Sequence, residues 1–233
     1  MRASSRERGL VAPLPTPTWE RLPEAKRDAV RRAAEEEFGV RGYNAASLNT
    51  ICREAGISKG SLFQYFTDKA DLFVHLIARA SHDIRAAMEA ASADFPWMTD
   101  YIGSVNMLMD AWIDYFYDHP RHRQMLVSAN LEHNPKALAA VREAVYVDYL
   151  EVIGGMIDLG IAIGALREDT DRDALVAAII MLLPHIALGP HVRGLDPLLG
   201  LAGSDRTHAM SVGRRLIQVL MGQYVCQSVS KEP

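Results

Sequence analysis

The segment from Ser58 to Phe66 combines side chains whose chemistry suits contact with a nucleic acid. On a helix that turns about 100° per residue, Leu62 and Phe66 fall on one side and could pack against other helices. A lysine can meet a phosphate, and a glutamine can pair with the edge of a base. The opposite side carries small, polar and aromatic residues with one cation, namely Lys59, Gly60, Ser61, Phe63, Gln64 and Tyr65.

Gly60 is the least expected residue of this segment, because a glycine inside a helix costs about 1 kcal/mol relative to alanine. The apolar face of the helix does not require a glycine at this position, so we expect another backbone to approach the helix here. Lys59 and the amides at the helix start would favour a nearby anion, and Ser61 could contact a base or a phosphate. A capped surface helix on an ordinary helical bundle is the alternative for this segment taken alone.

The residues before this segment predict a second short helix and a tight turn. Ser47 can cap a helix over residues 48–55. Gly56 suits the left-handed residue that ends a helix, and Ser58 suits the cap of the next one. Two short helices joined by so tight a turn form a helix-turn-helix.

The chain as a whole is predicted to be all-α, with an N-terminal three-helix helix-turn-helix domain followed by a helical ligand-binding and dimerisation domain. Residues 1–22 hold prolines and little apolar periodicity, which predicts a flexible N-terminal tail. The DNA-binding domain is expected over residues 23–68, with its first helix from about Pro23 to Gly39. A regulatory domain follows over residues 69–233. It begins with a linking helix capped by Asp68, and further helices are expected over residues 98–118, 121–132, 135–165, 171–189 and 205–225.

Charge is distributed unevenly along the chain, although the net charge is only -4. Residues 1–70 hold 12 Lys/Arg and 9 Asp/Glu, a net charge of +3, whereas residues 71–233 hold 13 and 20, a net charge of -7. A basic front end on an acidic body is expected of a separate nucleic-acid-binding module. In the tail, Arg2, Arg6 and Arg8 could reach into a minor groove, and a solvated tail is the alternative.

The stretch from Gly42 to Phe73 resembles the DNA-binding domain of the TetR family almost continuously, with the sequence GYNAASLNTICREAGISKGSLFQYFTDKADLF. That family shows a Gly-Tyr turn, a Ser/Thr-capped second helix, an Ala-Gly-Val/Ile-Ser turn and then Lys-Gly-Thr/Ser-Leu-Tyr-x-His/Tyr-Phe. The resemblance implies a sequence-specific DNA-binding transcriptional regulator, usually a repressor, that binds a roughly palindromic operator in double-stranded DNA.

The family's DNA contacts can be carried over position by position. Lys69 matches a position that family members use for phosphate. Phe63 stands where tyrosine is usual, so a hydroxyl contact to phosphate is missing, although its ring could touch a thymine methyl. Cys52 replaces a common alanine and is expected to have a buried apolar role. The resemblance implies DNA binding by Ser47, Ser58, Lys59, Gly60, Ser61, Phe63, Gln64, Tyr65 and Lys69.

Residues 164–169 and the Ala- and Ile-rich helix after them also resemble the regulatory half of TetR-like proteins. The resemblance implies a homodimer, in which the last two long helices form a four-helix interface with their copies. Two reading helices must lie about one helical turn apart on a two-fold operator, which favours this arrangement. Burial within one chain would explain the same apolar stripes, which consist of Ala177, Ala178, Met181, Leu182, Val212, Leu216, Val219 and Leu220.

A pocket for a small apolar or amphipathic ligand is expected among the middle helices. Pro184 interrupts a helix and could leave space beside it, and His185 could orient a ligand. Ligand binding would change the spacing of the two reading helices and release the DNA. The candidate ligand-binding residues, each of which could instead be ordinary core, are Trp112, Tyr115, Phe116, Met125, Tyr146, Tyr149, Met156 and His185.

Two alternative functions without DNA binding are a helical protein-interaction module and a metal-dependent enzyme. His119 and His122 could bind zinc only with further ligands, and His119-Pro120 also fits a turn. Sequence motifs for a nucleophile, a phosphate loop or a dinucleotide are absent, so we expect no catalytic residues, metal or cofactor. Two cysteines without ligand spacing, no cleavable signal and no bilayer-spanning apolar run favour a cytoplasmic protein.

Overall fold

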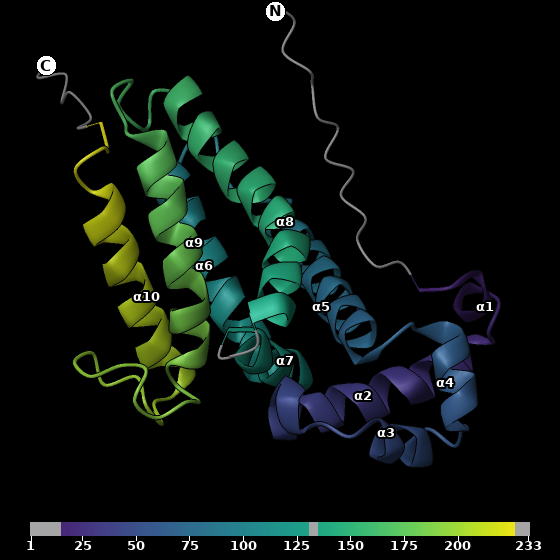
Figure 1. Ribbon diagram of the computed structural model, residues 1–233. Coiled ribbons are helices and arrows are strands. Elements are labelled where there is room, and N and C mark those ends of the chain that lie inside the picture. Colours follow the sequence, from purple (N-terminus) through teal and green to yellow (C-terminus); the bar gives the residue numbers. More distant parts are fainter. Residues whose placement is uncertain (1–14, 131–134, 227–233) are drawn as a thin grey trace, which may run out of the picture.

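The computed structural model describes residues 15–130 and 135–226, except the side chains of residues 135–138, 140 and 143–148. The predicted all-α fold is confirmed, since this part of the chain forms ten helices and no strand (Figure 1). Helices α2–α4 lie at one end of the molecule, and α5 runs from that end into a helical body. None of the described helices is long and apolar enough to cross a lipid bilayer.

Four helices make up the N-terminal end: α1 (Pro17–Glu20), α2 (Glu24–Ala45), α3 (Leu48–Glu54) and α4 (Lys59–Tyr65). The first predicted helix is longer than expected and does not stop at Gly39. A Cβ at Gly39 would lie 2.9 Å from the Cβ of Gln124, so this glycine serves a close approach of α7 to α2. The helical path is instead broken at Gly42, whose φ of 69° favours glycine.

The predicted flexible tail over residues 1–22 is wrong for residues 15–22. Residues 15–22 include α1, and Trp19 is only 2% exposed. The cause is Trp19 itself, because burying one large aromatic ring can order a short segment that has no helical periodicity. The arginines at positions 2, 6 and 8 lie outside the described residues.

The body contains the linking helix α5 (Lys69–Ser92), followed by α6 (Tyr101–Asp118) and α7 (Pro120–Asn130). The chain continues through α8 (Pro135–Ala162), α9 (Arg172–Leu188) and α10 (Arg206–Met221). These bounds agree with the predicted helices to within a few residues. Helices α6, α9 and α10 pack side by side, and α5 packs against α8 (Figure 1).

Two hydrophobic cores hold these helices together. The larger one lies in the body among α5, α6, α8, α9 and α10. The N-terminal core includes Phe38 of α2, Cys52 of α3 and Leu62 of α4. It also takes in Phe73 of α5 and Met125 of α7, both at most 1% exposed. The N-terminal core therefore extends past residue 68, the boundary expected from the sequence.

Candidate nucleic-acid interface

Side-chain caps set the geometry of the turn between α3 and α4. The Ser47 hydroxyl accepts a hydrogen bond from the Thr50 amide at 3.4 Å and caps α3, as predicted. Gly56 has a φ of 66° and ends the helix. The Ser58 hydroxyl accepts from the Ser61 amide at 3.0 Å and caps α4. These contacts give α3 and α4 the predicted helix-turn-helix arrangement.

Glu37 supports the same turn and is not suggested by any sequence motif. Its carboxylate accepts a hydrogen bond from the Ser47 amide at 2.8 Å, and the residue is only 7% exposed. A charge buried this deeply needs hydrogen-bonding or ionic partners, and Arg41 lies 3.4 Å from the same oxygen. Glu37 therefore fixes the start of α3 against α2.

Helix α4 has the packed face and the open face that its sequence predicts. Leu62 and Phe66 are each 2% exposed in the N-terminal core. The exposed side consists of Lys59, Gly60, Phe63 and Gln64. A Cβ at Gly60 would meet, among the described residues, only the Ser58 hydroxyl at an ordinary 3.7 Å. Packing within the described chain therefore gives no reason for this glycine.

The structure corrects the expected placement of Tyr65. Only 8% of Tyr65 is exposed, and its ring centroid lies 5.9 Å from that of Trp19. The ring is turned into the core because α1 covers the end of α4, which no pattern within α4 reveals. Ser61 is half-buried, and its hydroxyl lies 2.8 Å from that of Ser58.

Lys69 joins the start of α5 to the turn between α2 and α3. Its ammonium donates to the carbonyls of Asn44 at 3.2 Å and Ala46 at 3.3 Å. It also lies 4.7 Å from the centre of the Tyr43 ring. An ammonium has three donors, so these two contacts leave the chemistry needed to bind a phosphate.

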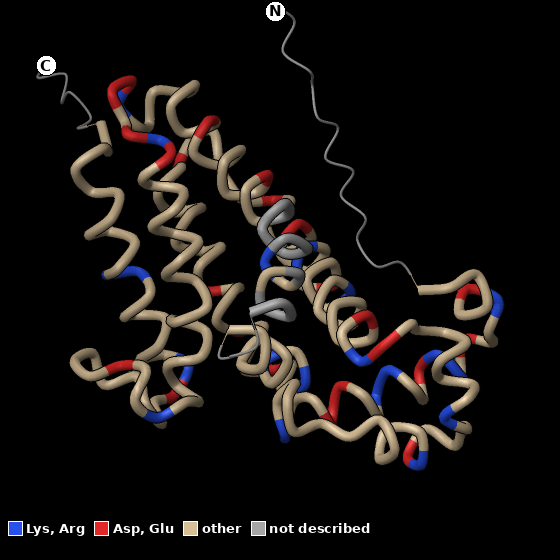
Figure 2. The backbone as a smooth tube through the Cα atoms, in the orientation of Figure 1, with Lys and Arg blue, Asp and Glu red and all other residues tan. Residues whose placement is uncertain are grey.

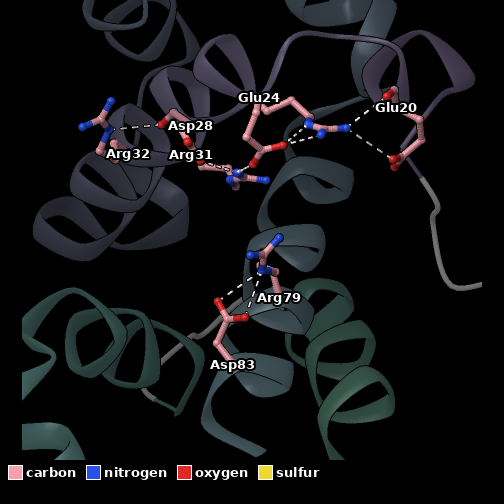
Figure 3. Close-up of polar contacts among 8 residues, drawn as sticks. Glu20, Glu24, Asp28, Arg31, Arg32, Arg79 and Asp83 are labelled. Carbon is pink, nitrogen blue, oxygen red and sulfur yellow. Dashed lines mark hydrogen bonds and ion pairs between the residues drawn. The ribbon is translucent and has the colours of Figure 1, made fainter. Parts of the chain in front are cut away.

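Both signs of charge are interspersed along α2, which weakens the argument from the basic front end (Figure 2). Arg27 and Arg31 pair with Glu24, and Arg31 also pairs with Asp28 (Figure 3). Among the described residues, no carboxylate lies within ion-pair distance of Lys59. The exposed cation of α4 is therefore better suited to an external phosphate than the ion-paired Arg27 and Arg31 of α2.

The candidate ligand residues divide between two neighbouring cavities in the body. Trp112, Tyr149 and Met156 line a cavity of about 70 Å³ with mostly apolar walls. Met125, Tyr149 and His185 line a cavity of about 260 Å³, together with Pro184. Sequence reasoning missed the polar wall of the second cavity, which is formed by Ser81, His122, Asn130 and Arg142.

Other candidate ligand residues lie elsewhere. Phe116 and Tyr115 line neither cavity, because α6 turns both rings into packing contacts. Phe116 is fully buried against Trp112, with 4.9 Å between ring centroids. The Tyr115 ring stacks on the His119 ring with 4.0 Å between their centroids. The Tyr115 hydroxyl lies 2.6 Å from the Nδ1 atom of His122. The Tyr146 side chain lies outside the described residues.

The two histidines considered for zinc belong to this aromatic stack. The Nδ1 atom of His119 lies 2.8 Å from the Tyr115 carbonyl. Burial lowers the pKa of His122 below its ordinary value. Within the described chain, no group of three or more His, Cys, Asp or Glu residues could hold a metal ion.

An exposed apolar face crosses α9 and α10. Met181 is 66% exposed and Val219 is 76% exposed. Val212 does not belong to this face, since it is 1% exposed in the body core and a one-residue difference on a helix turns a side chain by about 100°. The rest of the predicted stripe is exposed or half-buried and consists of Ala177, Ala178, Leu182, Leu216 and Leu220.

Comparison with known proteins supports the same assignment of the N-terminal helices. Residues 30–76 match the family model described as bacterial regulatory proteins, tetR family. The chain is 38% identical over 71 residues to the HTH-type transcriptional repressor BepR of Brucella suis, which is 30% of this chain and 34% of BepR. It is 26% identical over 125 residues to the HTH-type transcriptional activator FasR of Mycolicibacterium smegmatis, which is 53% of this chain and 56% of FasR. The chain thus spans about a third and about half of these two relatives.

The fold of the whole chain has counterparts among solved structures. The transcriptional regulator FadR of Bacillus subtilis, solved in complex with stearoyl-CoA, superposes with a TM-score of 0.66 at 16% identity. The superposition covers 83% of this chain and 97% of FadR. The family match and the curated relatives support a TetR-family regulator, and the shared fold extends the structural likeness over most of the chain.

Proposed function

We propose that the protein is a homodimeric, cytoplasmic repressor that binds a roughly palindromic operator through α4 and leaves it when a small apolar or amphipathic ligand binds the body. The observation that carries the DNA-binding part is the exposed face of α4. It combines an unpaired cation, Lys59, with Gly60 and the amide of Gln64. Lys59 suits contact with a phosphate, Gly60 allows close approach of the DNA, and the Gln64 amide suits hydrogen bonding to the edge of a base.

The relatives support regulation of transcription and leave its sign to experiment. BepR is named a repressor and FasR an activator. We favour repression for this chain on its resemblance to the TetR family alone, whose members are usually repressors. An enzyme is disfavoured, since both of these curated relatives are named as transcriptional regulators.

The dimer would form through the exposed apolar face of α9 and α10. Burial of large exposed side chains such as Met181 and Val219 would stabilise the association by about 25 cal/mol per Å² of apolar surface. Packing of these two helices against their copies would hold both reading modules in one rigid pair. A fixed separation of the two α4 helices is what a two-fold operator requires.

The second cavity offers a short connection between ligand and DNA. Met125 and Ala129 of α7 and Val141 of α8 line it and also belong to the N-terminal core. The Ser128 hydroxyl of α7 donates to the Phe38 carbonyl of α2 at 2.8 Å. A ligand that displaces α7 would therefore move α2, and with it α4. Such coupling is typically worth about 1–3 kcal/mol.

The ligand class is inferred from the walls of the cavities. An apolar chain fits the first cavity, and a polar group fits the second, which adjoins it through Ser81, Ile84 and Tyr149. The stearoyl-CoA bound by FadR has this combination of chain and polar group. An amphipathic molecule with one apolar chain is therefore the first class to screen.

The DNA-binding proposal is tested with two substitutions on α4. The operator is first selected from random duplexes with the wild-type protein. Lys59→Ala should weaken binding to every sequence and reduce the salt slope by about 1, whereas Gln64→Ala should relax preference at particular base pairs. Arg193→Ala, which removes an exposed charge from the body, is the matched control. Unchanged binding by both α4 variants, or selection of no sequence by the wild type, would refute the proposal.

A further inference from the structure

We propose that Thr16 and Trp19 are positioning residues that set the orientation of α4 and thereby contribute to operator recognition. The inference rests on the proposed DNA-binding function and adds a segment that precedes the family match at residues 30–76. Residues 15–22, which we call the clamp, precede α2 in the chain and contact the end of α4 in space. Figure 1 shows α1 beside α4, at the end of the molecule away from α10.

Two hydrogen bonds join the clamp to the last turn of α4. The Thr16 hydroxyl donates to the Gln64 carbonyl at 2.5 Å, and the Thr16 amide donates to the Tyr65 carbonyl at 3.0 Å. The last carbonyls of a helix have no partner within it. A helix of seven residues is also too short to be stable by itself. Thr16 therefore supplies partners where α4 lacks its own.

Trp19 fixes the same end of α4 through its ring. Its centroid lies 4.9 Å from that of Phe66, 5.9 Å from that of Tyr65 and 5.6 Å from that of His75. Because His75 belongs to α5, the indole fills the space between α4 and α5. Only 2% of Trp19 is exposed, so its surface is used in these contacts and provides no direct contact with DNA.

The other end of the clamp is held by α2. A guanidinium nitrogen of Arg27 donates to the Glu20 carbonyl at 3.0 Å and lies 3.7 Å from the Glu20 carboxylate. Arg27 is also paired with Glu24 (Figure 3). The clamp thus bridges α2 and α4 and restricts rotation of α4 about its own axis. Such a rotation would move Gln64, whose own carbonyl the clamp holds.

Substitutions at both positions can separate positioning from folding. Thr16→Val removes the hydroxyl with little change in volume, and Thr16→Ser is its control because it keeps the hydroxyl. Trp19→Ala empties the space between α4 and α5, and Trp19→Phe keeps a ring there. Each full-length variant is titrated against the operator selected by the wild type and against a shuffled duplex of equal composition. Thermal melting identifies any variant that is not folded.

We expect Thr16→Val to bind the operator about fivefold more weakly, the equivalent of one net hydrogen bond. The operator affinity of Trp19→Ala should fall about 5- to 150-fold, the range for one mismatched base pair. Binding to the shuffled duplex should change less than about twofold, because phosphate contacts dominate it. Thr16→Ser and Trp19→Phe should retain most of the wild-type ratio of operator affinity to shuffled-duplex affinity.

The ratio of operator affinity to shuffled-duplex affinity decides the result. A folded Thr16→Val variant with the wild-type ratio would overturn the clamp's role even if Trp19→Ala failed to fold. Equal losses on both duplexes would also overturn it, since they would indicate general destabilisation. Failure of the wild type to distinguish the duplexes would instead refute the proposed function itself, so the two failures are distinguishable.

Discussion

Replacing Gly60 with alanine should stabilise the free protein and weaken its binding to DNA. Gly60 is the second residue of α4, and its φ lies outside the left-handed region. The new Cβ would meet the Ser58 hydroxyl at 3.7 Å, an ordinary contact distance. The substitution then restricts the unfolded chain without straining the folded one. We expect a gain of about 0.5–1 kcal/mol in the free energy of unfolding.

The loss on DNA follows from the same added methyl group. If a DNA backbone or base edge packs directly on Gly60, the Cβ occupies space already filled in the complex. Adding a methyl group to a closely packed site costs about 1–3 kcal/mol. The operator affinity of Gly60→Ala should therefore fall about 5- to 150-fold.

Thermal melting followed by circular dichroism measures the first effect, and fluorescence anisotropy with a labelled operator measures the second. A gain of this size raises the melting temperature of a chain this long by about 1–4 °C. Gly155→Ala is the matched control, because this exposed glycine of α8 has no described atom within 4 Å of an added Cβ. It should stabilise the protein similarly and leave DNA binding unchanged. Wild-type operator affinity in Gly60→Ala would show that no DNA group approaches this residue.

Three further predictions concern acid stability, assembly and coupling. Burial lowers the pKa of His75 from its ordinary 6.5 to about 4, so its stabilising contribution is complete above pH 6.5 and decreases as the pH falls towards 4. Denaturant titrations should show a loss of unfolding free energy between pH 7 and pH 5 that is about 2 kcal/mol larger in the wild type than in His75→Phe. Met181→Asp should convert a dimer to monomers in analytical ultracentrifugation, because an unpaired charge is costly to bury. Met98→Asp, at a similarly exposed site outside α9 and α10, should not. Ser128→Ala should leave the affinity of the free protein for the ligand unchanged and reduce ligand-induced release of the operator about fivefold. Full release by this variant would argue against α7 as the connection between the ligand and α4.

Features with local causes could be predicted from the sequence. Ser47, Ser58 and Asp68 each cap the helix that follows, because a hydroxyl or carboxylate can accept a hydrogen bond from the backbone amide three residues later. Gly56 takes the left-handed conformation because it lacks a Cβ. The separation of Leu62 and Phe66 from Lys59 and Gln64 follows from helical periodicity alone.

Features with distant causes could not be predicted. The bond from Thr16 to the Gln64 carbonyl joins residues 48 positions apart, and no pattern near either residue indicates it. Packing of Trp19 against the end of α4 likewise buries Tyr65, although its position on the wheel placed it beside the reading face. Val212 matched the stripe proposed for dimerisation, but packing between α10 and α6 turns it inward. In each case the partner helix decides which side of an element is buried.

The extent of the N-terminal core bears directly on how a ligand could control DNA binding. A boundary at residue 68 would cut this core, because Phe73 and Met125 contribute to it from α5 and α7. Met125 also forms a wall of the second cavity. The proposed ligand cavity and the support of α4 thus share a side chain, so the proposed coupling needs no long relay between separate domains. The close approach of Gly39 to Gln124 leaves little space for α7 to move without α2. A ligand that prefers the displaced position of α7 would therefore act on the orientation of α4 through packing alone.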